Sequence, residues 1–96
     1  MSSDQRICNY LAQHKNAEEN SIFLELCEVF RRLGVTVRLE RGDFRSGLCR
    51  VHGGELILLL NRKQSPAELN AAMLAALNSL DHEAIYLTPR IREQMS

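Results

Sequence analysis

Histidine, cysteine and acidic side chains are the residues of this 96-residue chain that could serve as metal ligands, bases or nucleophiles. The histidines His14, His52 and His82 lie far apart, and only His52 has a cysteine near it, at Cys49. Positions three apart in a strand face opposite sides of a sheet, so this pair cannot hold a zinc ion without distortion. We therefore predict no metal site and no cofactor.

A second group with chemical potential is Asp81-His82-Glu83, which follows an expected helix. Histidine is favourably placed near the dipole of a helix C-terminus, so a solvated helix end is a simpler interpretation than a catalytic site. The chain has no G-x-S-x-G element and no phosphate-binding glycine loop. We predict no catalytic residue and favour a non-enzymatic role. The alternative is an enzyme that uses Cys49, His52 or residues 81–83.

Arginine supplies ten of the twelve basic residues, although the net charge is zero. Residues 31–63 hold eight basic and three acidic side chains, whereas both flanking thirds are acidic. Arginine favours bidentate contacts with carboxylates and phosphates. We predict that one sheet surface or edge binds an acidic protein partner through Arg38, Arg41, Arg45 and Arg50. Nucleic acid is the alternative partner, and a solvated, salt-bridged face is the non-functional interpretation.

The five consecutive aliphatic residues 56–60 must organise the fold that positions these side chains. A strand with this pattern is buried on both faces, because half-exposed strands alternate. Gly53-Gly54 just before it is typical of a two-residue hairpin turn. Residues 35–41 alternate strictly, which predicts a strand with one face on the core.

We expect an α+β fold built on a three-stranded antiparallel meander, with strands at about 35–41, 46–52 and 55–60. Helices at about 21–33 and 65–80 should cover one face, with short terminal helices beside them. Asn20 or Ser21 would cap the first helix, and Ser65-Pro66-Ala67-Glu68 has the pattern of a capping box. Residues 1–19 form a short helix or a mobile arm. The inward side chains of the first two strands would be Val35, Val37, Leu39, Cys49 and Val51.

Length and composition predict a single domain over residues 1–96. A hydrophobic content of 45% and a charged content of 25% are ordinary globular values. No apolar run is long enough for a membrane span and no signal pattern opens the chain, so we expect a cytoplasmic protein without membrane contact. Three widely spaced cysteines argue against a disulfide framework, and we expect Cys27 and Cys49 to be buried.

The third strand predicts self-association, because its second face needs a cover. The N-terminal arm, the C-terminal segment or another copy of the chain could supply that cover, and an uncovered apolar edge strand would promote aggregation. We favour a homodimer whose interface includes Leu48, Ile57 and Leu59. The expected function is thus a non-enzymatic bacterial interaction module that self-associates and binds an acidic protein.

The chain shows two resemblances to known families. Ser46-Gly47-Leu48-Cys49-Arg50, Leu58-Leu59-Leu60-Asn61 and Tyr86-Leu87-Thr88-Pro89-Arg90 together resemble a family of small uncharacterised bacterial proteins, which implies no activity. The order strand, strand, Asn61, helix is similar to the ImmA/IrrE-type metallopeptidases, whose helix carries H-E-x-x-H. Residues 76–80 have neither histidine nor glutamate, so this resemblance implies a degenerate domain without zinc or hydrolysis.

Overall fold

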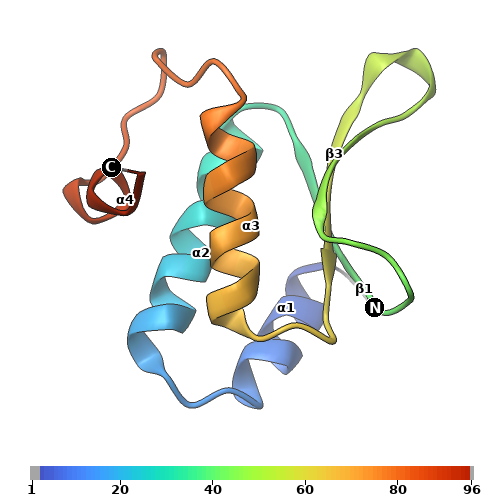
Figure 1. Cartoon of the computed structure of the whole chain (residues 1–96), viewed down its shortest axis with the longest axis vertical. Helices are drawn as coiled ribbons and strands as arrows, with labels where there is room; N and C mark the ends of the chain where they lie inside the picture. Colours follow the sequence, from blue (N-terminus) through green and yellow to red (C-terminus); the bar gives the residue numbers. More distant parts are fainter. Residues whose placement is uncertain (1–2, 96) are drawn as a thin grey trace.

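The computed structural model describes residues 3–95 and consists of four helices beside a three-stranded sheet (Figure 1). The elements are α1 (Ser3–Ala12), α2 (Ala17–Arg32), β1 (Thr36–Glu40), β2 (Gly47–Arg50), a 3-10 turn (His52–Gly54), β3 (Leu56–Asn61), α3 (Pro66–Asn78) and α4 (Pro89–Met95). Helices α2 and α3 pack side by side between the sheet and α4 (Figure 1). The predicted α+β class is confirmed. No helix within residues 3–95 combines the length and apolar character that crossing a membrane requires.

The sheet is mixed, and its strand order is β1-β3-β2. The central strand β3 runs parallel to β1 and antiparallel to β2. The predicted antiparallel meander is therefore wrong, although the β2–β3 hairpin is present, with positive φ at Gly53 and Gly54. A meander would have put the aliphatic strand β3 at an edge. The central position gives the backbone of β3 partners on both sides and leaves the alternating β1 and the short β2 at the edges.

The connection from β1 to β2 crosses the end of β3, because these two strands are not neighbours. Asn61, buried at the end of β3, holds this connection in place. Its Nδ2 donates hydrogen bonds to the carbonyl oxygens of Gly42 and Phe44, each at 2.8 Å. The Asn61 backbone N–H donates to Ser46 Oγ at 2.8 Å. One buried amide thus organises the loop from β1 to β2, which in the predicted meander would have joined two paired strands.

Helix α2 begins earlier than predicted, because Asn16 caps it in place of Asn20 or Ser21. The Asn16 side chain accepts a hydrogen bond from the Glu19 backbone N–H at 3.0 Å. Asn20 lies inside the helix, and its Nδ2 donates hydrogen bonds to the carbonyl oxygens of His14 at 2.8 Å and Leu11 at 3.3 Å. The helix buries an apolar stripe against the sheet and α3, and it ends just before Gly34, whose φ is 81°.

The remaining helices follow the predicted signals closely. Ser65 and Glu68 form the predicted capping box at the start of α3. The segment predicted as a short helix or a mobile arm is helical in α1, and its first two residues lie outside the described residues. Helix α4 is fastened to α2 by Arg90, which pairs with Glu25 and donates to Ser21 Oγ at 2.8 Å.

The core lies between the helices and one face of the sheet. Its largest fully buried side chains are Tyr10, Phe23, Phe30, Leu26, Leu58, Leu60, Leu69, Met73, Leu77, Ile91 and Cys27. The register pairs Leu48 with Leu58, so Leu48 turns toward the helices and the next residue, Cys49, turns away. Cys49 and Val51 are exposed, and their predicted inward orientation is wrong because β2 pairs with β3 and not with β1.

Candidate functional site

The sheet face that points away from the helices, which we call the outer face, is the first candidate site. The register places Ile57 and Leu59 of β3 at its centre, between Arg38 on β1 and Cys49 on β2. Both aliphatic side chains are half-buried, and neither belongs to the described hydrophobic side chains that pack against the core. Leu58, which lies between them on the strand, is 0% exposed on the opposite face. The run predicted to be buried on both sides is therefore covered on one.

Charged side chains border the outer face along β1. Glu40 accepts from Arg38 at 3.1 Å and from Arg6 of α1 at 3.0 Å. These pairs are largely exposed, so each contributes little to stability. On the β2 side, a Cβ atom added to Gly47 would meet nothing within 4 Å, so this border is open. The outer face is thus an aliphatic strip with both signs of charge on one border and free space on the other.

The three residues predicted to mediate self-association divide between the two faces. Ile57 and Leu59 lie together on the outer face. Leu48 lies on the helix-facing side, where it is half-buried and packs against the core. Only two of the three are therefore available to an interface on the outer face.

The four predicted partner-binding arginines do not share one surface. Arg38 is on the outer face, whereas Arg50 pairs in register with Leu56 and therefore lies on the helix-facing side. Arg50 also belongs to the opposite end of the sheet, where its guanidinium donates to the Gly54 carbonyl at 3.0 Å. Arg41 and Arg45 lie in the connection between β1 and β2, and both are exposed.

Two basic residues beside Arg41 and Arg45 were missed by the sequence analysis. Arg62 and Lys63 directly follow β3, whose end lies next to the end of β1 in the parallel pair. The sequence showed that they belong to the basic middle third, but the observed strand order is what makes the ends of β1 and β3 direct neighbours, with no strand between them.

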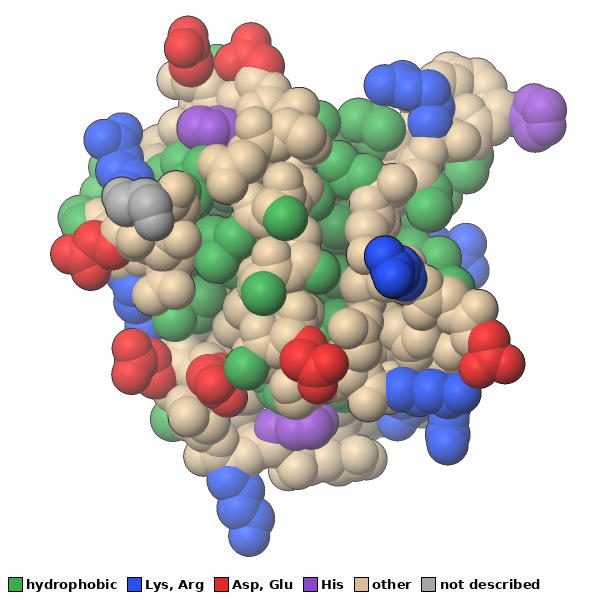
Figure 2. Space-filling view, viewed as in Figure 1, with side chains coloured by type: hydrophobic (Ala, Val, Ile, Leu, Met, Phe, Trp, Pro, Cys, Tyr) green, Lys and Arg blue, Asp and Glu red, His purple; other side chains and the backbone are tan. Residues whose placement is uncertain are grey.

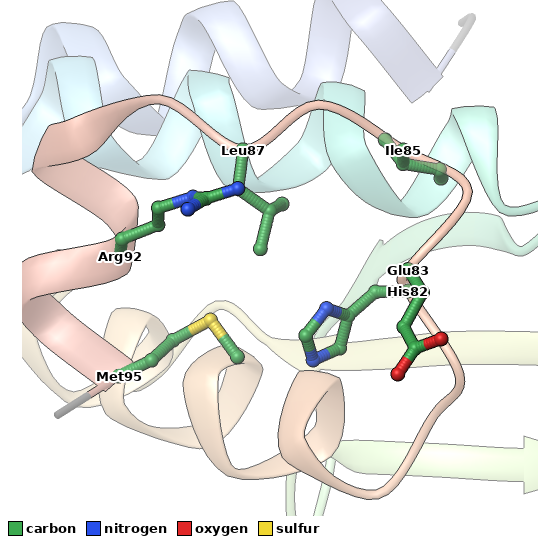
Figure 3. Close-up of a pocket in the computed structure, with 6 residues that line it drawn as sticks. All are labelled: His82, Glu83, Ile85, Leu87, Arg92 and Met95. Carbon is green, nitrogen blue, oxygen red and sulfur yellow. The ribbon is translucent and has the colours of Figure 1, made fainter.

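A cavity of about 410 Å³ lies between the segment after α3 and helix α4 (Figure 3). Its lining residues are His82, Glu83, Ile85, Leu87, Arg92 and Met95. The imidazole of His82 points toward Met95, while the carboxylate of Glu83 points away from both (Figure 3). Among residues 3–95, the lining includes no serine, threonine or cysteine, so these residues offer no hydroxyl or thiol for His82 to activate as a nucleophile. The cavity is better suited to binding an apolar group than to catalysing a reaction through a nucleophilic side chain.

The histidine and cysteine side chains considered as metal ligands stay apart. Cys49 is on the outer face and His52 is at the exposed tip of the hairpin. Among residues 3–95, no three histidine, cysteine, aspartate or glutamate side chains come together as a metal-binding group.

Two groups with shifted pKa values lie where α1 meets the start of α3. Burial, with a further contribution from the charge of Glu68, raises the pKa of Tyr10 to about 12. Tyr10 Oη donates to the Gln64 carbonyl at 2.5 Å. Hydrogen bonds from the Ser65 backbone N–H and then from its hydroxyl lower the pKa of Glu68. These shifts come from contacts that hold the framework together and do not mark a reactive site.

No protein-family model, curated protein or solved structure matches this chain. Both family resemblances therefore stay predictions. In α3, which would correspond to the metallopeptidase helix, the only acidic residue is Glu68, and the capping box uses it. The candidate functions must be judged on the geometry of the chain itself.

Proposed function

We propose that this protein is a non-enzymatic interaction module that forms homodimers through the outer face of its sheet. The observation that supports the proposal is the mismatch within β3, where residues 56–60 are all aliphatic although the helices cover only the side of Leu58 and Leu60. A second copy that packs on the outer face would cover Ile57 and Leu59. The sequence requirement for burial on both sides would then be met.

The aliphatic strip gives the proposed interface its hydrophobic centre. Full burial of a Leu or Ile side chain contributes about 1.5–3 kcal/mol, so completing the burial of the half-buried Ile57 and Leu59 contributes at most about 1 kcal/mol each. A dimer would bury this pair twice. Association costs at least about 4 kcal/mol in lost translational and rotational freedom. The residues that border the outer face must therefore also make contacts in the dimer.

The charged border supports a second copy as the occupant. A two-fold interface uses the same patch on both subunits, so the patch must be complementary to itself. Arg38 and Glu40 place both signs of charge on one strand of the outer face, and two copies could exchange these pairs across the axis. The open border at Gly47 leaves room for the close approach of another backbone.

Sedimentation velocity on the wild-type chain and on an Ile57→Lys/Leu59→Lys variant tests the proposal. We expect a wild-type dimer at about 100 µM, a concentration that detects even modest affinity. The double variant should sediment as a monomer, because two ammonium groups per copy would be desolvated in the interface. Its circular dichroism spectrum should stay unchanged, because neither side chain packs on the core.

The matched control is Leu24→Lys, which makes the same chemical change at a leucine of α2 that is 50% exposed. This variant should remain dimeric. A monomeric wild-type chain, or equal dissociation of the control, would contradict the proposed interface.

A further inference from the structure

A cluster of basic side chains forms where the parallel strands β1 and β3 end together. The register pairs Glu40 with Asn61, so Arg41 and Arg62 follow neighbouring strand ends. The Arg62 backbone N–H donates to the Glu40 carbonyl at 2.9 Å, which holds the two segments side by side. This proximity depends on the parallel pairing and would not arise in a meander.

Two further cations complete this group, which we call the basic cluster: Arg41, Arg45, Arg62 and Lys63. Lys63 Nζ pairs with the Asp43 carboxylate at 3.2 Å, which ties the loop after β1 to the end of β3. All four basic side chains are exposed. Lys and Arg side chains are visible at this lower end of the sheet, on the right of Figure 2.

The arginines of the basic cluster form no ion pair with the part of the chain that the structure describes. Within residues 3–95, no carboxylate forms an ion pair with Arg41, Arg45 or Arg62, while Asp43 balances Lys63. Elsewhere on the surface, arginines that pair with a glutamate are Arg6, Arg32, Arg38 and Arg90. The cluster therefore carries three positive charges that the described chain does not neutralise.

The backbone that carries the cluster is held firmly. Asn61 Nδ2 fixes the loop through the Gly42 and Phe44 carbonyl oxygens. Ser46 Oγ donates to Gln64 Oε1 at 2.5 Å and ties the end of the loop to the segment before α3. A binding surface that is already ordered loses less conformational entropy when a partner binds.

We infer that the basic cluster binds a short acidic segment of a protein partner, at a site separate from the outer face. Guanidinium groups form paired hydrogen bonds with carboxylates, and the cluster is exposed, as contact with a macromolecule requires. The net charge of the chain is zero, and its first and last thirds are acidic. Outside the basic cluster, the chain has eight basic and twelve acidic side chains. A long polyanion such as nucleic acid would extend over this net-negative remainder, whereas a short acidic segment engages the cluster alone.

Fluorescence anisotropy with a labelled oligoglutamate peptide tests this inference on the full chain. At about 50 mM salt, where screening is weak, we expect saturable binding to the wild-type protein. An Arg41→Ala/Arg62→Ala variant should bind about tenfold more weakly, since each exposed ion pair is worth about two- to fivefold in affinity. Raising the salt to about 300 mM should weaken wild-type binding further.

The matched control is Arg32→Ala/Arg50→Ala, which removes two exposed guanidinium groups away from the cluster. Arg32 is on α2 and Arg50 is at the opposite end of the sheet. The control should bind the peptide as the wild type does. Equal weakening of both variants, or no peptide binding at low salt, would overturn the inference. Tighter binding of a labelled oligothymidylate than of oligoglutamate at the same salt would also overturn it and assign the cluster to nucleic acid.

Discussion

The two faces of β3 have the same kind of side chain but different surroundings. Leu58 and Leu60 are 0% exposed beneath the helices, whereas Ile57 and Leu59 are half-buried on the outer face. An aliphatic run of this kind is expected to be buried on both faces, and the helices bury only one of them. Side chains that look equivalent in the sequence therefore differ in what they determine: the inner pair is part of the core, and the outer pair is free to contact another molecule.

The difference teaches that stability and association can be changed separately in one strand. Removing a buried aliphatic side chain costs the transfer free energy and leaves a cavity. Changing a half-exposed one costs only part of the transfer free energy. Variants on the inner face should thus alter unfolding, and variants on the outer face should alter self-association.

The largest expected difference between the two faces of β3 is seen by placing an aspartate on each face in turn. We expect Leu58→Asp to abolish cooperative unfolding, because an unpaired carboxylate would be buried in the central strand at a cost of several kcal/mol. Leu59→Asp should leave the free energy of unfolding of the subunit within about 1 kcal/mol of the wild-type value. Urea denaturation followed by circular dichroism, at a concentration low enough to keep both chains monomeric, measures the two. Similar losses in both variants would mean that the faces are equally buried.

The next effect concerns the residue that lets β3 occupy the centre of the sheet. Asn61→Ala removes the donors to the Gly42 and Phe44 carbonyl oxygens and the acceptor for the Lys63 N–H, which Asn61 Oδ1 binds at 3.1 Å. We expect a loss of about 2–3 kcal/mol in the free energy of unfolding, since buried polar groups would lose their partners. Hydrogen exchange in the loop after β1 should also accelerate.

Asn78→Ala, at the exposed end of α3, is the control for the Asn61 substitution. It should change the free energy of unfolding by less than about 0.5 kcal/mol. If the two alanine variants unfold at the same urea concentration, Asn61 does not hold the crossing loop.

Local signals in the sequence predicted most of the helices and the hairpin. The capping box at Ser65 and the glycine pair at Gly53 act over a few residues, so spacing alone was enough to identify them. The strand order was predicted wrongly because it depends on a long-range choice. Asn61 holds the loop between β1 and β2 through hydrogen-bond partners that are 17 and 19 residues away, and no local sequence pattern predicts such contacts.

The candidate sites were predictable only in part, for the same reason. Ile57 and Leu59 follow from alternation within one strand once its covered face is known. Leu48 and Arg50 were assigned with β2 beside β1, and the actual pairing turns both toward the helices. Arg62 can be assigned to the basic cluster only from the parallel register, which places it beside Arg41.

A smaller effect sharpens the comparison by testing how α1 is attached to the covered side of the sheet. Tyr10→Phe removes the hydrogen bond to the Gln64 carbonyl and should cost about 1–2 kcal/mol at neutral pH. Burial raises the pKa of Tyr10 from its usual 10 to about 12, so the neutral phenol is favoured in the folded chain. The stabilisation of the folded chain by the neutral Tyr10 phenol is therefore complete below pH 10 and is lost as the pH rises toward 12.

The wild-type chain should therefore lose its advantage over Tyr10→Phe between about pH 10 and pH 12. Urea midpoints of both proteins across this range measure the difference, and other titrating groups are common to the two chains. A constant gap at all pH values would show that the phenol does not ionise with the shifted pKa.

The smallest effect lies at the start of α3, where the chain turns from β3 back over the covered face. Ser65→Ala removes the side-chain cap and should cost about 1 kcal/mol at neutral pH. Hydrogen bonds from the Ser65 N–H and hydroxyl lower the pKa of Glu68, so this contribution is present above the usual glutamate pKa and is lost as the pH falls through the lowered value. Acid should therefore destabilise Ser65→Ala less than the wild type.

Glu68→Gln keeps a capping-box side chain without the charge, so its stability should depend on acid still less. Thermal melts from about pH 6 to pH 3 compare all three chains. If the three lose stability in parallel, the cap is not coupled to Glu68, and the helices cover the inner face without help from this carboxylate.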